Sequence, residues 1–342
     1  MSEELRVGLL GCGLIGQTHL KVWAQTPGAR VVSVYDRNPA RACQVAEQTG
    51  AHGYASLEAL LDAGGLDAVD ICTPSGLHAD QGLAAARRGL HVLCEKPLDL
   101  NLEKADQLIA ECEARGLTLA CIFQQRVYRG AQQVARLIAE ERMGRLLSAS
   151  AYVKWWRSQD YYSKSGWHGT WALDGGVLAN QAIHSIDFLC WLAGPVEEVE
   201  YAHLETAAHM MEAEDYALAV LRFANGARGV IEATTCCSPD LCSRVEIFGT
   251  RGSVAFDDAS VVQFGLDGQD RQASIEQDGE DLGGRSDPKA ISLYGHEVLL
   301  ADFVEAVRTG RKPLVSGQEA RVSVEAIHKI YHKAFPNRRL GV

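Results

Sequence analysis

The alternation of apolar and polar positions divides the chain into two regions that meet near residue 123. From residue 5 to residue 122, short apolar runs alternate with amphipathic stretches. Strands are predicted at 6–10, 31–35, 68–72, 91–93 and 117–123, and helices at 15–25, 39–49, 77–88 and 101–114. Strands that alternate with helices over such short spacings predict parallel βαβ units and a doubly wound α/β domain over residues 1–122.

Beyond residue 123 the β-like runs follow one another more directly. Asn225-Gly226, a favoured hairpin turn, separates two of them, and the polar stretch 266–289 predicts a long surface loop. The predicted strands are 146–156, 196–204, 216–223, 227–235, 244–248 and 253–256, and the predicted helices are 131–140, 180–192, 297–308 and 318–334. This pattern predicts an α+β domain over residues 123–342 with a large, mostly antiparallel open sheet.

Composition and charge narrow the function classes. The 342 residues are 47% hydrophobic and 23% charged, which is typical of a globular protein. A formal net charge of −11 argues against nucleic acids and membrane surfaces as partners. The sequence shows neither a signal-peptide pattern nor an apolar run long enough to span a membrane. The ten cysteines are scattered without a Cys-x-x-Cys pair, so we expect free thiols and a cytoplasmic protein.

A glycine-rich motif follows the first predicted strand. Gly11-Cys12-Gly13-Leu14-Ile15-Gly16 has the G-x-G-x-x-G spacing of dinucleotide-binding turns, which is a weak signal by itself. Its context strengthens it, because a strand precedes it, a helix follows it, and Asp36 lies 20 residues after Gly16. Gly11 permits the tight turn, Gly13 lets the backbone approach the pyrophosphate, and Gly16 lets the helix pack closely on the sheet. The helix amino terminus, at Leu14 and Ile15, would then offer N–H groups to the phosphates, as in a Rossmann domain.

Asp36 and Arg37 bear on which dinucleotide is bound. The Asp36 carboxylate would accept hydrogen bonds from the adenosine ribose hydroxyls and repel a 2′-phosphate, which favours NAD over NADP. Arg37 leaves NADP open, because its guanidinium could stack on adenine or accommodate the extra phosphate. Asp36 could instead serve only the turn in Asp-Arg-Asn-Pro.

Two further polar motifs follow predicted strands. They are Thr73-Pro74-Ser75-Gly76-Leu77-His78 and Glu95-Lys96-Pro97. Ligands of open parallel sheets lie beyond the carboxyl ends of the strands, so both motifs are predicted to face the dinucleotide. The predicted cofactor contacts are Thr73, Pro74, His78, Glu95 and Lys96. Taken alone, Glu95-Lys96 could be a solvated turn.

The order of these motifs resembles one oxidoreductase family. The glycine motif, Thr-Pro…His, Glu-Lys-Pro and the later Gly-Gly-Val-Leu-Ala-Asn-Gln-Ala-Ile-His-Ser-Ile-Asp look like the glucose–fructose oxidoreductase, inositol dehydrogenase and MocA (Gfo/Idh/MocA) family, over essentially the whole chain. The resemblance implies that Lys96 lies by the nicotinamide and the substrate hydroxyl, and that His184 is a general acid or base. The position four residues before that histidine is usually aspartate in the family and is Asn180 here.

The asparagine changes the expected chemistry. Because Asn180 cannot take a proton, an aspartate–lysine relay is not available. The i, i+4 spacing predicts that Asn180 and His184 share one helix face and touch one substrate. His184 is then the expected base, since an imidazole titrates near working pH, while Lys96 polarises and orients the hydroxyl. Without the motif, His184 would be interpreted as a structural histidine in an apolar helix.

Several residues of the second region resemble the family branch that acts on nucleotide-linked amino-sugar uronates and related pyranosides. The likeness rests on Asn-Gln-x-Ile-His, Tyr161-Tyr162, Trp167-His168-Gly169-Thr170-Trp171 and Phe123-Gln124-Gln125-Arg126. Aromatic rings offer flat faces to sugars, and an arginine can hold a carboxylate or phosphate through two hydrogen bonds. The predicted substrate contacts are Gln124, Arg126, Arg157, Trp167, Asn180 and His184. The aromatic residues could instead belong to the core, and Arg157 to the surface.

The predicted activity is hydride transfer between NAD(P) and a secondary hydroxyl of a sugar, cyclitol, uronate or sugar nucleotide, at C3 of a pyranose. No metal is expected, because neither His184-x-x-Asp187 nor Cys236-Cys237…Cys242 has a recognisable ligand spacing. Two alternatives stay open: an NAD-dependent glycoside hydrolase that oxidises its substrate transiently, and a non-catalytic dinucleotide-sensing protein. The resemblance also implies a homodimer or homotetramer that assembles through the open face of the second sheet.

Overall fold

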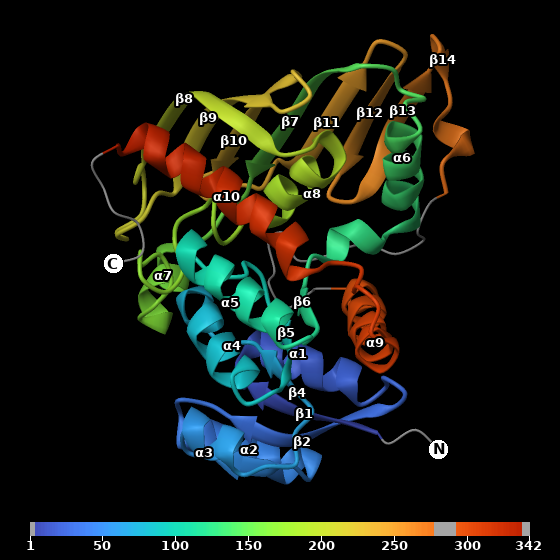
Figure 1. The fold of residues 1–342 in the computed structure, drawn as a ribbon. Coiled ribbons are helices and arrows are strands. Elements are labelled where there is room, and N and C mark those ends of the chain that lie inside the picture. Colours follow the sequence, from blue (N-terminus) through green and yellow to red (C-terminus); the bar gives the residue numbers. More distant parts are fainter. Residues whose placement is uncertain (1–3, 277–291, 337–342) are drawn as a thin grey trace. The chain divides into compact units, whose positions relative to one another are not determined.

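The computed structural model describes residues 4–276 and 292–336, which belong to two compact units (Figure 1). The first unit runs to Ile122 and also takes in Leu293–Arg321, and the second begins at Phe123 and includes the chain from Val322. The sequence divided the chain at the same junction but assigned residues 293–321 to the second domain. The assignment of one functional role to each unit stays a prediction.

The first unit is a doubly wound α/β fold, which confirms the predicted fold class. Its six strands lie in the order β3-β2-β1-β4-β5-β6, and every neighbouring pair is parallel. The strands are β1 Leu5–Leu10, β2 Ala29–Tyr35, β3 His52–Tyr54, β4 Ala68–Ile71, β5 His91–Cys94 and β6 Leu119–Cys121. The helices are α1 Leu14–Trp23, α2 Pro39–Thr49, α3 Leu57–Asp62, α4 His78–Ala86, α5 Leu102–Ala114 and α9 Tyr294–Thr309. The strand order reverses between β1 and β4, which is where open α/β sheets bind ligands.

Local sequence accounts for most of these elements. β4 is buried along its whole length, as expected for a parallel strand that is covered on both faces. Pro39 opens α2, and the Asn101 side chain caps α5 by accepting a hydrogen bond from the Lys104 amide. The hydrophobic pattern did not predict β3 or α3. β3 gives a weak signal because it has three residues, includes Gly53 and lies largely exposed at the sheet edge.

The second unit contains an eight-stranded sheet in the order β14-β13-β12-β11-β7-β10-β9-β8. All neighbouring pairs are antiparallel except β7 with β10, which confirms the mostly antiparallel sheet. The strands are β7 Leu146–Lys154, β8 Val196–Glu205, β9 Tyr216–Phe223, β10 Arg228–Thr234, β11 Cys242–Gly249, β12 Gly252–Asp257, β13 Ser260–Leu266 and β14 Gln269–Asp270. The helices are α6 Arg129–Ala139, α7 Gln159–Ser165 and α8 Ile183–Ala193. A fourth helix, α10 Gly317–Ala334, belongs to this unit from Val322 on. Figure 1 shows α6 and α8 on the same face of this sheet.

Two loop predictions have different outcomes. The Asn225-Gly226 hairpin is confirmed, since it joins the antiparallel β9 and β10, and Gly226 has a φ of +85°. The predicted loop at 266–289 is wrong at its start, because Gln269–Asp270 pairs with β13. The rest of that prediction, from residue 277, lies outside the described residues. No helix within residues 4–276 and 292–336 is both long enough and apolar enough to cross a membrane.

Candidate active site

The glycine motif forms the turn between β1 and α1. Gly11 has a φ of +96°, and a Cβ there would lie 2.5 Å from the Cys72 carbonyl oxygen, so a side chain is excluded. A Cβ on Gly16 would collide with the Gly11 carbonyl, whereas one on Gly13 would meet nothing within 4 Å. Gly11 and Gly16 are therefore required by the fold itself. The open space at Gly13 fits a ligand that must come close to the backbone.

The amino terminus of α1 is the part of the turn that suits a phosphate. Gly13 caps the helix without a side chain, and Leu14 is half exposed. The first N–H groups of a helix have no partner within it and carry a partial positive charge, so they favour anions. These residues can hold the pyrophosphate of a dinucleotide, in agreement with the predicted roles of Gly13, Leu14 and Ile15.

Asp36 is tied to the glycine turn. Its carboxylate accepts hydrogen bonds from the amides of Cys12 at 2.9 Å and Asn38 at 2.7 Å, and the guanidinium of Arg41 lies 3.3 Å away. Asp36 therefore serves the turn, as the sequence left open. Its oxygens keep further lone pairs that could accept hydrogen bonds from a ribose, and this role stays a prediction. Arg37 is exposed. The cation that pairs with Asp36 is Arg41. The sequence did not predict this pair, because Arg41 lies in α2, five residues after Asp36.

The loops after β4 and β5 are tied together by His78. Its ring nitrogens lie 2.7 Å from the Pro97 carbonyl oxygen and 2.8 Å from that of Thr73, and the side chain is buried. Thr73 donates its hydroxyl hydrogen to Gln81. Both ring nitrogens of His78 are thus engaged by the protein, and we assign it a bracing role in place of the predicted cofactor contact.

Glu95 and Lys96 have different environments although they are adjacent. Glu95 is buried, and its Oε2 accepts a hydrogen bond from the Lys96 amide at 3.0 Å. Burial would raise the pKa of Glu95, but hydrogen bonds from His19 and His296 hold it well below its usual range. Glu95 is therefore an inward-facing carboxylate, whereas Lys96 is partly exposed.

Asn180 and His184 are not on one helix, so that part of the prediction is wrong. α8 begins at Ile183, and Asn180 lies in the preceding turn, which follows Gly175-Gly176. The Asn180 amide donates to the Gly176 carbonyl, but the Ala182 amide donates to Val177, five residues earlier, so the turn does not have regular helical bonding.

The side chain of Asn180 is fixed by a carboxylate that the sequence did not reveal. Its Nδ2 donates to Asp174 Oδ1 at 2.7 Å and to the Tyr161 hydroxyl at 3.3 Å. Burial and then Asp174 raise the pKa of Tyr161 to about 12, so the phenol stays protonated at neutral pH. The Asn180 side chain therefore belongs to a polar cluster. Asn180 stands where the family usually has an aspartate, and the carboxylate of Asp174 lies beside it.

His184 lies in the first turn of α8 and is only partly buried, whereas most of that helix is fully buried. Its ring meets Phe123 edge to face, with ring centroids 6.1 Å apart. A histidine that keeps exposed surface in an otherwise buried helix can exchange protons with a bound molecule, which supports the predicted role of the imidazole.

Two of the predicted substrate contacts have structural partners. Arg126 is buried and donates two hydrogen bonds, of 2.7 and 2.6 Å, to the carboxylate of Asp187. These two hydrogen bonds tie the Arg126 guanidinium to α8. The prediction that Arg126 binds a substrate anion is therefore not supported. Arg157 is also buried, with its guanidinium 5.2 Å from the centre of the Trp155 ring and 5.7 Å from that of Tyr161. It is not a surface charge.

Gln124 and Trp167 stay predictions as substrate contacts. Gln124 lies in a short 3-10 turn, and its buried Oε1 accepts no hydrogen bond from the residues that the structure describes. Trp167 is partly exposed, and its ring lies 4.0 Å from that of His168, which stacks on Tyr161 at 4.2 Å. This aromatic group borders Asn180 through Tyr161, so its place agrees with a sugar-binding face.

Three groups within residues 4–276 and 292–336 have the composition of a metal site. Their ligand atoms lie within 4.8 Å of one another, but ring nitrogens in each already pair with carboxylates. Burial also raises the pKa of the Cys72 thiol, which disfavours the thiolate that a metal requires. The groups are His19–Asp70–Cys72, His19–Glu95–His296 and His209–Asp215–Cys236. The expectation of a protein without a metal stays a prediction.

A buried carboxyl supports the turn that carries Asn180. Glu214 Oε1 accepts hydrogen bonds from the Leu178 amide at 3.1 Å and the Tyr331 hydroxyl at 2.8 Å. A Cβ on Gly176 would collide with this carboxyl group, so the second glycine of Gly-Gly is needed for close approach. Burial raises the pKa of Glu214 from 4.5 to about 7.

Glu214→Gln is expected to remove part of the pH dependence of stability. Because the folded chain holds the proton up to about pH 7 and the unfolded chain releases it near pH 4.5, stability falls across this window. The loss amounts to about 3 kcal/mol in the free energy of unfolding. Urea unfolding at about pH 5 and about pH 8 should show this fall in the native chain and not in the variant, whose amide adds only a pH-independent offset. Parallel pH profiles of the two proteins would contradict the assignment.

Comparisons with known proteins cover both units. Residues 5–123 match the oxidoreductase family with an NAD-binding Rossmann fold, GFO_IDH_MocA, and residues 131–255 match the GFO/IDH/MocA C-terminal domain. The WlbA dehydrogenase from Bordetella pertussis, solved with NADH and UDP-GlcNAcA, is 31% identical, with a TM-score of 0.87 over 99% of this chain and 98% of that one. Inositol 2-dehydrogenase of Rhizobium meliloti is 30% identical over 73% of this chain and 75% of its own length. Myo-inositol 2-dehydrogenase of Thermotoga maritima is 25% identical over 94% and 93%.

Proposed function

Because this chain belongs to the Gfo/Idh/MocA oxidoreductase family, we propose that it is an NAD-dependent dehydrogenase of a nucleotide-linked amino-sugar uronate, acting at C3 of the pyranose. The observation that carries the proposal is the 31% identity to the WlbA dehydrogenase over 99% of the chain. The glycine turn agrees with it, since Gly13 leaves room for a pyrophosphate where Gly11 and Gly16 leave none. Sugars and cyclitols that carry a comparable secondary hydroxyl are the wider substrate class.

We assign the following roles to the residues of this chain. The glycine turn and the start of α1 would hold NAD, whose nicotinamide, when bound, would supply the hydride acceptor for the carbinol carbon. Lys96 donates a hydrogen bond to the hydroxyl that is oxidised and stabilises the negative charge that develops on its oxygen. His184 takes the hydroxyl proton, so the products are the ketone, NADH and one proton held by the imidazole. Asn180, fixed by Asp174, orients the substrate by hydrogen bonding to this hydroxyl or its neighbour.

Asp36→Asn is expected to weaken the preference for NAD over NADP. The amide keeps one oxygen acceptor for the glycine turn but removes the negative charge that repels a 2′-phosphate. We expect the ratio of kcat/KM for the two cofactors to fall by about 10-fold, which corresponds to about 1.4 kcal/mol. Glu47→Gln, on the exposed face of α2, is the matched control and should leave the ratio unchanged. An unchanged ratio in the Asp36 variant would mean that Asp36 serves only the turn.

A panel of sugars, cyclitols, uronates and sugar nucleotides, screened for NADH and NADPH formation, tests the proposal. We expect a UDP-linked N-acetylated amino-sugar uronate to give the highest kcat/KM, and mass spectrometry to show a ketone two mass units lighter than the substrate. Hydrolysis without accumulation of NADH would indicate the glycoside hydrolase instead. Tight NADH binding without turnover of any member would indicate the sensing protein.

We further propose that the chain works in the cytoplasm as a homo-oligomer. Tyr201, Phe248 and Val262 are large apolar side chains exposed on strands of the second unit's sheet. Strands that expose apolar residues on one face are typical of a surface that a second copy covers.

A further inference from the structure

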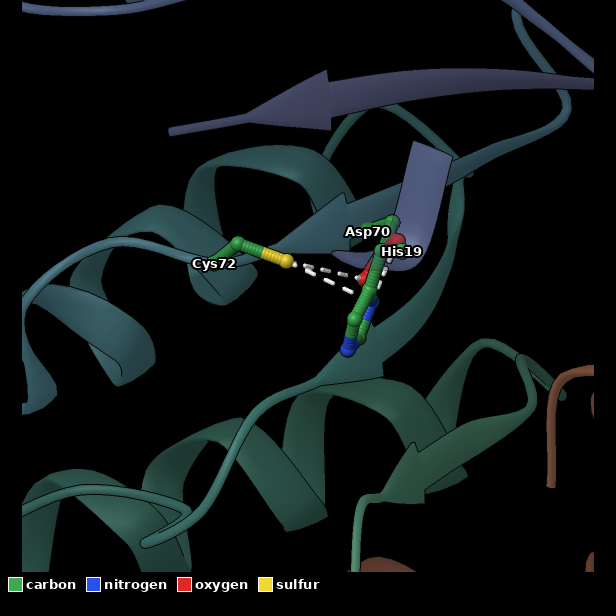
Figure 2. Close-up of side chains that lie close together, drawn as sticks. All are labelled: His19, Asp70 and Cys72. Carbon is green, nitrogen blue, oxygen red and sulfur yellow. Dashed lines mark hydrogen bonds and ion pairs between the residues drawn. The ribbon is translucent and has the colours of Figure 1, made fainter. Parts of the chain in front are cut away.

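The first unit contains a buried cluster of ionic side chains that includes Glu95 of the Glu-Lys-Pro motif. His19 from α1 places Nδ1 2.8 Å from Asp70 Oδ2 and Nε2 3.0 Å from Glu95 Oε1, with no exposed surface on its side chain. Figure 2 shows His19 against Asp70 of β4, and the Cys72 thiol lies 3.4 Å from His19 Nδ1 and 3.7 Å from Asp70 Oδ1. These residues therefore join the first helix to the ends of β4 and β5.

Both ring nitrogens of His19 lie within hydrogen-bond distance of carboxylates, an arrangement that favours the protonated ring. Burial would lower the pKa of His19, but the charge of Asp70 and its hydrogen bond raise it well above its usual value. Trp23 adds a hydrogen bond from its indole to Asp70 at 2.7 Å. The charges are thus paired, although they lie in the interior.

Stability alone does not explain why the chain buries a group of charges of this kind. The desolvation of three charges offsets most of their attraction, and well-packed apolar residues often give an equal or higher stability. His296 from α9 lies against the same group, with Nε2 3.6 Å from Glu95 Oε1 and its ring 5.3 Å from that of His19. Two histidines and two carboxylates therefore converge on this place, and Glu95 is the carboxylate that lies close to both histidines.

Glu95 connects the cluster to Lys96. One of its oxygens is held by His19, and the other accepts the hydrogen bond of the Lys96 amide at 3.0 Å. Its own amide donates to the Ile71 carbonyl at 2.9 Å. The backbone that carries the Lys96 side chain is fixed from within the sheet, and a shift of this backbone would move the ammonium by a similar distance.

We propose that Glu95, held in place by His19, is a positioning residue that sets the backbone of Lys96 for hydride transfer, and this inference rests on the proposed role of Lys96. Misplacing a reacting group by about 1 Å can cost about 100-fold in rate, so a weakened anchor lowers kcat more than cofactor binding. The proposed pyrophosphate site, at the glycine turn and the start of α1, does not include Lys96.

Glu95→Leu tests the inference because it removes both acceptors and keeps a similar volume. We expect kcat to fall about 100-fold for the most active sugar of the panel, with the Kd for NADH, from fluorescence titration, within about 2-fold of the native value. Glu95→Gln keeps one acceptor for the Lys96 amide if His19 becomes neutral, so it should lose no more than about 10-fold. Wild-type kcat in Glu95→Leu would overturn the proposal.

The matched control is His91→Leu, at the opposite end of β5. His91 accepts a hydrogen bond from the Thr118 amide at 2.9 Å, so its loss also strands a backbone donor in the same sheet. We expect a similar fall in melting temperature and a kcat close to the native value. An equal loss of kcat in this control would show that Glu95 has a structural role only. If Glu95→Leu does not fold, His19→Gln takes its place, with a fall in kcat of about 10-fold expected and native kcat contradicting the proposal.

A double-mutant cycle separates this inference from the proposed function. If Glu95 acts through Lys96, Glu95→Leu causes no further loss of single-turnover rate in a Lys96→Ala background. If the two losses multiply, the positioning role fails while the role of Lys96 stands. If Lys96→Ala alone turns over at the native rate, the assigned role of Lys96 fails, whereas the proposed function itself fails only if the native chain turns over no member of the substrate panel.

Discussion

Lys96→Ala should lower kcat about 1,000-fold, since it removes the group that we assign to the developing charge on the substrate oxygen. Lys96 follows β5 at the carboxyl end of the parallel sheet, where ligands of such folds bind, and it is partly exposed beside a buried Glu95. Stopped-flow measurement of NADH formation from the most active sugar gives the rate of the chemical step.

The binding of NADH distinguishes catalysis from a damaged cofactor site in this variant. The Kd for NADH should change by less than about 10-fold, because the proposed pyrophosphate site at the amino terminus of α1 does not include Lys96. Lys104→Ala is the matched control, since the Lys104 ammonium pairs with Asp80 on the surface at 2.8 Å, and it should leave kcat unchanged. Native turnover in Lys96→Ala would remove the lysine from the mechanism.

The sequence predicted the first unit well because its signals are local. The glycine turn, the buried strands, the start of α2 at Pro39 and the Asn101 cap of α5 each depend on residues within a few positions of one another. The second sheet was also predicted, although β13 and β14 were missed, since β13 mixes buried and exposed residues without a clean alternation. Periodicity identifies an element when one face is buried along its whole length, and it fails at short or edge strands.

The roles of individual site residues were harder to predict, because they depend on partners far along the chain. Arg126 looked available for a substrate anion, but its partner Asp187 is 61 residues away. His78 looked like a ligand-facing residue, but the Pro97 carbonyl that it holds is 19 residues away. A motif identifies which residues matter, whereas only tertiary contacts decide which of them face a ligand and which support the loops.

The pairing of Asn180 with Asp174 bears on which residue is the base. Asp174 is buried, and its two oxygens accept hydrogen bonds from the Asn180 side chain and the Gly169 amide, each at 2.7 Å. These two hydrogen bonds hold the Asp174 carboxylate beside the Asn180 side chain. We therefore assign Asp174 the role of orienting Asn180, and we assign the acceptance of the hydroxyl proton to His184.

His184→Ala should accordingly lower kcat about 1,000-fold near neutral pH, because no other group assigned to the site accepts the hydroxyl proton. Since hydroxide can replace the lost base, the residual rate should rise with pH where the native enzyme reaches a plateau. Initial rates of NADH formation across the pH range measure both effects. His203→Ala, at an exposed position on β8, is the control and should keep the native profile.

Added imidazole decides whether the loss in His184→Ala reflects a missing base or a disturbed helix. α8 buries every side chain from Ser185 to Cys190, so the alanine variant should keep its fold and leave space where the ring was. A free imidazole that enters this space restores proton transfer, and we expect the rate to rise in proportion to the unprotonated imidazole present. If the rate of the variant is high without imidazole, or if Asp174→Asn lowers it further while imidazole has no effect, the proton goes to Asp174 and the mechanism uses a carboxylate after all.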